Sequence, residues 1–438
     1  MQRKGSAGFV AILVSVVLVG LVPAHAAPGD IDWISRGDVD SIPVSVFVSP
    51  SGDTLYATNS SFELVAFDAA SGAVQWQAER PGHRSFDEEG FRESFAWELS
   101  PDGSRIFATG YIVLGPWWNT AFLTTAWDAT TGERVWTSRK FHGESLVARS
   151  VAVSPDGDAV LVTGRRGGSK AGTVAYDADT GAMLWTTTIR GSEPVTCDLA
   201  VDPGGERLYL TGTVDAHNLS VAYALEDGER LWTHRQQGYP SFCSQMAADP
   251  AGSTVFVTAT STSRQNGNES RYLTIALDAV NGEEAWARRF NAAPESLDHP
   301  VEVLVAPAAD SVVVTGASGS EIGTVAYDAG SGGTRWVARS DAVAEPNDMT
   351  LDPMARRLYV LGTAWGPGEN DWDDFILLAY DVETGAEAWS AVWGGAGELR
   401  EQADAVAVDP IAGRVYVAGS SADGEGSYDA VVIAFAAT

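Results

Sequence analysis

Four polar residues occupy the same place in four successive repeats of the chain, each five residues before a proline. They are Asp198, Gln245, Glu302 and Asp348. If the fold brings these positions together, the three carboxylates could bind a cation or raise one another's pKa by repulsion. They could equally contact water or accept hydrogen bonds from backbone amides. We therefore predict that they lie at the mouth of a central channel.

The densest acidic segment contains Asp371, Asp373 and Asp374. Carboxylate oxygens are the ligands that Ca²⁺ prefers. The spacing differs from that of an EF-hand loop, and a solvated acidic loop is the alternative. Ca²⁺ is the cation that these residues would suit.

Four tryptophans fall on loops, outside the repeated tryptophan series described below. They are Trp117, Trp118, Trp365 and Trp372. Exposed aromatic rings could stack on sugars or form the centre of a protein interface. Packing of the long loops against each other is the alternative.

Arg165, Arg166 and Lys170 form a compact basic cluster that could meet an anionic ligand. We expect these side chains to pair with nearby acids instead. The sequence has no Gly-x-Ser-x-Gly elbow, no Walker loop and no histidine pair with metal-ligand spacing. It therefore carries no standard catalytic signature.

The elements that would position these residues follow from one repeated motif, Ala-x-Asp-x-x-x-Gly-x-x-x-Trp. It is intact in six copies, and a seventh has Ala224 in place of the aspartate. Each repeated tryptophan is expected to fill the wedge between neighbouring sheets. These docking residues are Trp33, Trp76, Trp136, Trp185, Trp232, Trp286, Trp336 and Trp389.

An eighth copy of the motif is split between the two ends of the chain, with Gly29–Trp33 at one end and Ala434 and Phe435 at the other. A second series, of Pro-Gly turns, recurs about every 50 residues. Four short strands per repeat predict an all-β, eight-bladed β-propeller of four-stranded blades. An N-terminal strand completes the C-terminal blade and closes the ring. The repeats differ most in the loops opposite the Pro-Gly turns, so we expect function there.

The ends and the composition suggest an exported protein. Residues 1–26 begin with positive charges, continue with an apolar run and end with Ala-His-Ala, which fits a signal-peptidase cleavage site. This pattern predicts a signal peptide. Residues 27–438 would form a single propeller domain. The net charge of −30 disfavours nucleic acid and anionic lipid as partners. Cys197 and Cys243 lie at nearly equivalent places in adjacent repeats, so a disulfide is predicted, with two free thiols as the alternative.

The docking motif resembles the tryptophan-docking repeats of the eight-bladed quinoprotein (PQQ) dehydrogenase superfamily, and the last repeats resemble the extracellular β-propeller repeats known as SBBP. The resemblance implies the scaffold. It argues against PQQ, because this chain lacks the adjacent cysteine pair and the Glu–Asn–Asp set of those dehydrogenases. The superfamily also contains a non-enzymatic propeller lipoprotein of outer-membrane assembly, whose lipid anchor this chain lacks.

Our leading interpretation is a secreted or periplasmic, non-enzymatic binding module with no membrane span, monomeric, whose loops bind an unidentified protein or glycan. No cofactor is predicted. One alternative is an enzyme with its site at the channel mouth, either a quinoprotein-like oxidoreductase or an enzyme acting on polysaccharide. The other is a carbohydrate-binding propeller that uses the four loop tryptophans.

Overall fold

The chain folds almost entirely into β-strands. The computed structural model describes residues 27–437 apart from 38–42, 79–91, 115–118, 145, 193–194, 216, 237–244, 263–269, 292–295, 308–309, 353–355, 366–372, 396–399 and 423–427. Among the described residues there is no α-helix, and so no helix that could cross a membrane. These residues form six four-stranded sheets and one seven-stranded sheet, all antiparallel between neighbours.

The strands follow one another outward within each sheet. The first three sheets contain β2 (Pro43–Val48), β3 (Thr54–Asn59), β4 (Leu64–Asp68) and β5 (Val74–Gln77); β6 (Arg92–Leu99), β7 (Arg105–Val113), β8 (Asn119–Asp128) and β9 (Arg134–Glu144); and β10 (Leu146–Val153), β11 (Ala159–Arg166), β12 (Lys170–Asp177) and β13 (Met183–Arg190). The next two contain β14 (Val195–Val201), β15 (Arg207–Val214), β16 (His217–Ala224) and β17 (Arg230–Arg235); and β18 (Gln245–Ala248), β19 (Thr254–Thr262), β20 (Ser270–Asp278) and β21 (Glu284–Phe290).

The remaining strands form the seven-stranded sheet and the sheet that joins the chain ends. The seven-stranded sheet contains β22 (Asp298–Ala306), β23 (Ser311–Ser318), β24 (Glu321–Asp328), β25 (Thr334–Leu351), β26 (Arg357–Ala364), β27 (Asp374–Asp381) and β28 (Glu387–Trp393). The last sheet has the order β1 (Ile31–Gly37), β31 (Tyr428–Ala436), β30 (Arg414–Ala422) and β29 (Glu401–Asp409).

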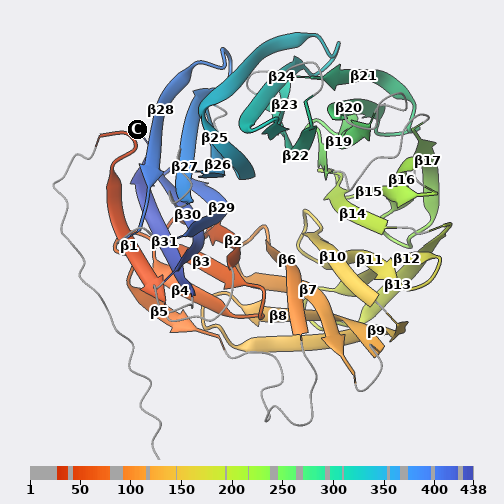
Figure 1. Ribbon diagram of the computed structural model, residues 1–438. Helices are drawn as coiled ribbons and strands as arrows, with labels where there is room; N and C mark the ends of the chain where they lie inside the picture. The colour runs from red at the N-terminus through yellow and green to blue at the C-terminus, as the bar shows by residue number, and fades with distance from the viewer. Residues whose placement is uncertain are drawn as a thin grey trace, which may run out of the picture.

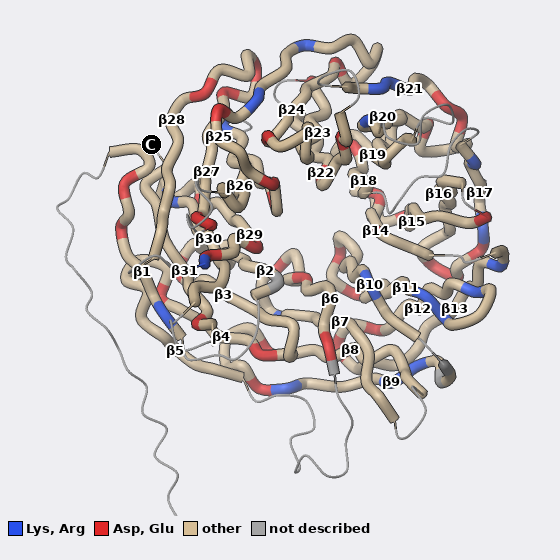
Figure 2. Tube along the Cα trace, in the orientation of Figure 1, with Lys and Arg blue, Asp and Glu red and all other residues tan. Residues whose placement is uncertain are grey.

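The sheets stand around a common centre, and the first strand of each lies nearest to it (Figure 1). These central strands are β2, β6, β10, β14, β18, β22, the second half of β25, and β29. Each contacts the next, and β29 contacts β2. Acidic residues are spread over the rim and near the centre (Figure 2). We call the face that carries the β11–β12 and β26–β27 connections the loop face, and the face with the Pro-Gly turns the turn face.

Strand β25 departs from the predicted pattern of four separate strands per repeat. It pairs with β24 through Thr334–Arg339 and with β26 through Ala344–Leu351. It is therefore the outer strand of one unit and the central strand of the next, which explains why two units count as one seven-stranded sheet.

The two halves of the split motif meet in the last sheet. β1 pairs antiparallel with β31, with Ile31 opposite Phe435 and Trp33 opposite Ala434. An ion pair at 2.7 Å between Arg414 Nε and Asp32 Oδ2 adds a contact with β30. The N-terminal strand thus supplies the outer edge of the C-terminal sheet.

The tryptophans of the docking motif contact the next sheet, as predicted. The indole N–H of Trp185 donates to the carbonyl of Leu225 in the next sheet at 2.8 Å, and Trp389 donates to Ala437 at 3.3 Å. The motif glycine of that next sheet lies against the ring: a Cβ on Gly228 would come within 2.6 Å of Trp185 Cε3. The glycine is needed both for this approach and for its φ of +72°.

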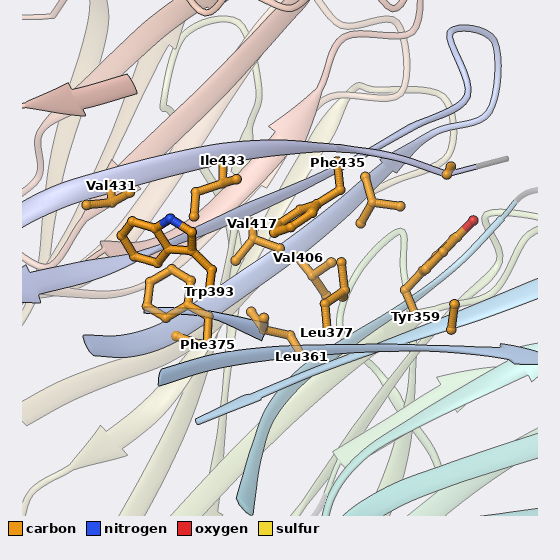
Figure 3. Close-up of a cluster of buried hydrophobic side chains, with 14 residues drawn as sticks. Tyr359, Leu361, Phe375, Leu377, Trp393, Val406, Val417, Val431, Ile433 and Phe435 are labelled. Atoms are coloured by element: carbon orange, nitrogen blue, oxygen red, sulfur yellow. The ribbon is translucent and has the colours of Figure 1, made fainter. Parts of the chain in front are cut away.

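Apolar side chains fill the space between sheets. In one such cluster Leu361 and Leu377 of the seven-stranded sheet pack against Val417 and Ile433 of the terminal sheet (Figure 3). Trp393 and Phe375 lie at one end of this cluster with ring centroids 5.0 Å apart. Each sheet therefore buries its faces against two neighbours rather than within a single core.

Candidate functional site

The predicted channel residue Asp198 lies on the central strand β14 and connects it to both neighbouring central strands. Its Oδ1 accepts hydrogen bonds from the Ser150 hydroxyl of β10 at 3.1 Å and from the Leu199 amide at 2.8 Å. Its Oδ2 accepts from the Met246 amide of β18 at 2.9 Å. Burial raises the pKa of Asp198 to about 6, although these hydrogen bonds oppose the shift.

Glu302 on β22 and Asp348 on β25 form a second connection between central strands. The Met349 amide donates to Glu302 Oε2 at 2.8 Å and to Asp348 Oδ1 at 2.9 Å. The Val406 amide of β29 donates to Asp348 Oδ2 at 2.7 Å. The position five residues before the turn proline therefore accepts an amide hydrogen from the following central strand in three units.

The carboxyl groups of Glu302 and Asp348 both accept from the Met349 amide and therefore lie close together. Two carboxyl groups this close can hydrogen-bond each other only when one of them carries a proton. Burial and the adjacent Asp348 charge raise the pKa of Glu302 well above its ordinary value. Burial raises the pKa of Asp348 to about 6, while the bond from Glu302 opposes this shift. We therefore expect the two carboxyl groups to share one proton near neutral pH and to titrate as a pair, with Glu302 the more strongly favoured in its protonated form.

Glu98 is a member of this group that the sequence analysis missed. It lies on β6, two residues after Ala96, and residues two apart face the same side of a strand. Burial, with a contribution from the negative charge of Asp198, raises the pKa of Glu98 to about 8. Strand alternation could have identified it, because Glu98 is three residues before its turn proline.

The other predicted channel residue, Gln245, is exposed at the start of β18, opposite Thr258. Asp404, one position earlier in its repeat than the predicted set, accepts a hydrogen bond from Gln402 Nε2 at 3.1 Å. Burial raises the pKa of Asp404 to about 7. Asp198, Glu302, Asp348, Glu98 and Asp404 are thus five acids of the central strands whose pKa is raised toward or above neutral pH.

A β-bulge explains why acids at two successive positions, five and six residues before the turn proline, both lie in this group. The register shifts between Thr196 and Asp198, and likewise between Pro346 and Asp348 and between Ala403 and Ala405. The extra residue interrupts the simple alternation of side chains along the strand, so side chains five and six residues before the turn proline can both face the centre.

The two other predicted sites are only partly covered by the structure. Asp373 and Asp374 adjoin β27, and burial together with Asp373 raises the pKa of Asp374; Asp371 lies outside the described residues. Within the described ranges, no group of three His, Cys, Asp or Glu side chains is arranged to hold a metal ion. Among the loop tryptophans, Trp365 is 44% exposed, whereas Trp117, Trp118 and Trp372 lie outside the described residues.

Cys197 is the extra residue of the bulge on β14. Its predicted partner Cys243 lies outside the described residues, so the disulfide stays a prediction. The basic cluster differs from expectation: none of Arg165, Arg166 and Lys170 forms an ion pair with a described residue. Pairing with nearby acids therefore does not explain that cluster.

Comparison with known proteins supports the predicted fold. A family model described as outer membrane protein assembly factor BamB matches residues 15–112, 122–352 and 271–433. A comparison with curated protein sequences found no match.

Solved structures resemble the chain along almost its whole length. BamB from Moraxella catarrhalis is 16% identical, with a TM-score of 0.54, over 93% of this chain and 97% of that one. The C-terminal WD40 domain of Sif2 is 10% identical, with a TM-score of 0.61, over 92% and 99%. The computationally designed Ika8 protein is 13% identical, with a TM-score of 0.59, over 90% and 96%. At these identities the likeness establishes the propeller fold alone.

Proposed function

Because the chain belongs to the family described as outer membrane protein assembly factor BamB, we propose that it is a non-enzymatic module that binds a protein through its loop face. We further propose that it is exported after removal of residues 1–26. Fold alone does not carry a function, so the proposal depends on the surface described below.

We infer eight blades. The seven-stranded sheet counts as two blades that share β25, and the other six sheets count as one each. The contact between β29 and β2 and the pairing of β1 with β31 support a closed ring. A closed ring presents its loops on one rigid face, which suits a binding scaffold.

The observation that carries the binding proposal is an exposed apolar pair on the loop face. Trp365 follows β26 and Val343 lies on β25, and the Trp365 amide donates to the Val343 carbonyl at 2.9 Å. Their side chains are 44% and 46% exposed, whereas the docking tryptophan Trp185 is 8% exposed. An exposed tryptophan beside an aliphatic side chain is typical of the centre of a protein interface.

Acidic residues surround this pair. Asp341 and Glu345 are exposed and lie two residues on either side of Val343 in the sequence. Glu321 of β24 pairs directly opposite Val343 in the strand register. An apolar centre with a charged rim is the usual anatomy of a protein–protein interface.

The central acids argue against the quinone-dependent alternative. A tricarboxylate cofactor placed among Glu98, Asp198, Glu302 and Asp348 would meet carboxyl groups instead of cations. Three of these residues also already accept backbone amides from adjacent strands. The residues present therefore do not fit the cofactor, and we assign them a role in joining the blades.

Site-specific crosslinking would test the proposal. A photoreactive amino acid at Trp365 should form an adduct with one protein in the producing cells. The same group at Leu184, which is 52% exposed on β13, is the matched control on the outer rim and should form none. Equal adducts from both positions, or none from Trp365, would contradict the proposal.

Calorimetric titration with PQQ and Ca²⁺ should release no heat, and tight Ca²⁺-dependent binding would restore the enzyme alternative.

The same exposed ring favours a second candidate, carbohydrate binding, because sugars stack on tryptophan. Glycan-array binding that is lost in Trp365→Ala but kept in Leu184→Ala would support that interpretation. Absence of any glycan signal would leave the protein partner as the proposal.

A further inference from the structure

Three cationic side chains lie in one row at the loop face. Lys170 of β12 pairs directly opposite Arg190 of β13. On the other side, Arg165 pairs opposite Ala171, so the next position in the same register places Arg166 opposite Lys170. Directly opposite residues share a sheet face. Arg166, Lys170 and Arg190 thus form a row across three strands, which we call the basic row; basic segments gather around β11, β12 and β13 in Figure 2.

The basic row has no counter-charge within the described residues. None of its three members forms an ion pair there. Asp215 Oδ1 would lie 3.2 Å from a Cβ placed on Gly191, the residue after Arg190, but the Asp215 carboxylate is already paired with Arg235 at 3.3 Å. Like charges directly opposite each other destabilise a sheet. The chain has 58 acidic residues against 28 basic ones, yet no acid in the described part of the chain forms an ion pair with this row.

Arg166 is held in place rather than free to move away from its neighbours. Its guanidinium lies 3.4 Å from the centroid of the Phe141 ring and donates through Nη1 to Thr188 Oγ1 at 2.8 Å. Burial and the positive charge of Arg190 both lower the pKa of Arg166. A stacked, oriented guanidinium is the arrangement that proteins use to bind oxyanions.

The surroundings leave room for a ligand. Lys170, Arg190 and Gly168 are exposed or half-buried, and a Cβ at Gly168 would meet no atom within 4 Å. Three neighbouring strands place the row over roughly 10 Å, because adjacent strands are about 4.8 Å apart. Two linked phosphate groups match that span and present oxygens to both guanidinium and ammonium groups.

We propose that the basic row is a binding site for a small, multiply charged phosphate anion such as a diphosphate group. The proposal is independent of the protein partner proposed above. A free anion fits better than an anionic membrane, because the net charge of −30 would repel an extended negative surface. A small ligand close to the row avoids most of that repulsion, since charges are screened beyond about 8–10 Å at physiological salt.

Calorimetric titration of residues 27–438 with pyrophosphate at physiological salt, where the negative charge of the rest of the protein is screened, provides the test. We expect binding that Lys170→Gln together with Arg190→Gln weakens at least tenfold. Arg230→Gln, which removes an exposed cation on β17, is the matched control and should change the affinity less than twofold. Absence of pyrophosphate binding would overturn the proposal. So would a loss of affinity in Arg230→Gln equal to that in the double variant.

Two further measurements separate the alternatives. Without anion, the double variant should melt at a higher temperature than the unmodified protein, because repulsion is relieved. Pyrophosphate should raise the melting temperature of the unmodified protein only, in excess of chloride at equal ionic strength. Vesicles of anionic phospholipid should not carry the protein in flotation. Flotation that depends on the basic row, without binding of pyrophosphate, would show that the ligand is a lipid surface and refute the free anion.

Discussion

Replacing Glu302 by glutamine tests whether a proton is shared in the ring centre. Glu302→Gln preserves both hydrogen bonds of the protonated side chain: its carbonyl can accept from the Met349 amide, and its amide can donate to Asp348. The variant removes only the ability to ionise. We therefore expect it to be slightly more stable than the unmodified protein at pH 5 and much more stable at pH 8.

The direction of this pH dependence follows from the raised pKa of Glu302. Because the pKa of Glu302 is higher in the folded protein than in the unfolded chain, the folded state retains a proton that the unfolded chain has released. The contribution of Glu302 to the stability of the folded protein is greatest below the ordinary glutamate pKa. It is lost as the pH rises through the pKa that Glu302 has in the folded protein. One retained proton changes the free energy of unfolding by about 1.4 kcal/mol per pH unit. The glutamine variant should lose that slope.

Urea unfolding followed by tryptophan fluorescence at pH 5, 6.5 and 8 would measure the difference. Glu98 and Asp404 titrate in both proteins, so their contributions cancel in the comparison. Glu302→Ala should show the same reduced pH dependence as the glutamine variant. Its free energy of unfolding should be about 1–3 kcal/mol lower than that of the glutamine variant at every pH, because the Met349 amide loses one acceptor. Identical pH profiles for the unmodified protein and the glutamine variant would refute the shared proton.

Two further predictions concern the scaffold. Gly228→Ala should cost about 1–3 kcal/mol more than Gly157→Ala in urea unfolding, since both glycines have positive φ but only Gly228 contacts Trp185; equal losses would contradict the docking role of the glycine. The predicted Cys197–Cys243 disulfide should make the intact mass lighter by two hydrogens, and its reduction should lower the free energy of unfolding by roughly 2–4 kcal/mol. Labelling of both thiols in the unreduced, denatured protein would contradict it.

The sequence predicted the propeller class because its repeated residues have roles that recur. A tryptophan that packs on a glycine of the next sheet must reappear at every interface, so Trp185 and Gly228 are visible in the motif. The uninterrupted course of β25 was not predictable, because nothing in Val337–Pro346 distinguishes a continuous strand from a strand, a loop and a second strand.

The central site was predicted less completely, for physical reasons. Asp198, Glu302 and Asp348 were found because they share one repeat position. The bulge beside Asp198 adds a residue without any composition signal. The sharing of a proton depends on contacts between strands about 50 residues apart in sequence. Whether Arg166 has an acidic partner likewise depends on neighbours that repeat spacing does not reveal.

The pairing of β1 with β31 makes closure of the propeller wait until its last strand has been made. Ile31 lies in the first strand of the propeller, and its partner Phe435 lies in the last. Until β31 is available, β1 and β30 each present an unpaired apolar edge, which can associate with other chains. A chain interrupted before Tyr428 would keep both edges open permanently. Such fragments should therefore aggregate or be degraded, and the final nine-residue strand acts as a check that the whole propeller has been made.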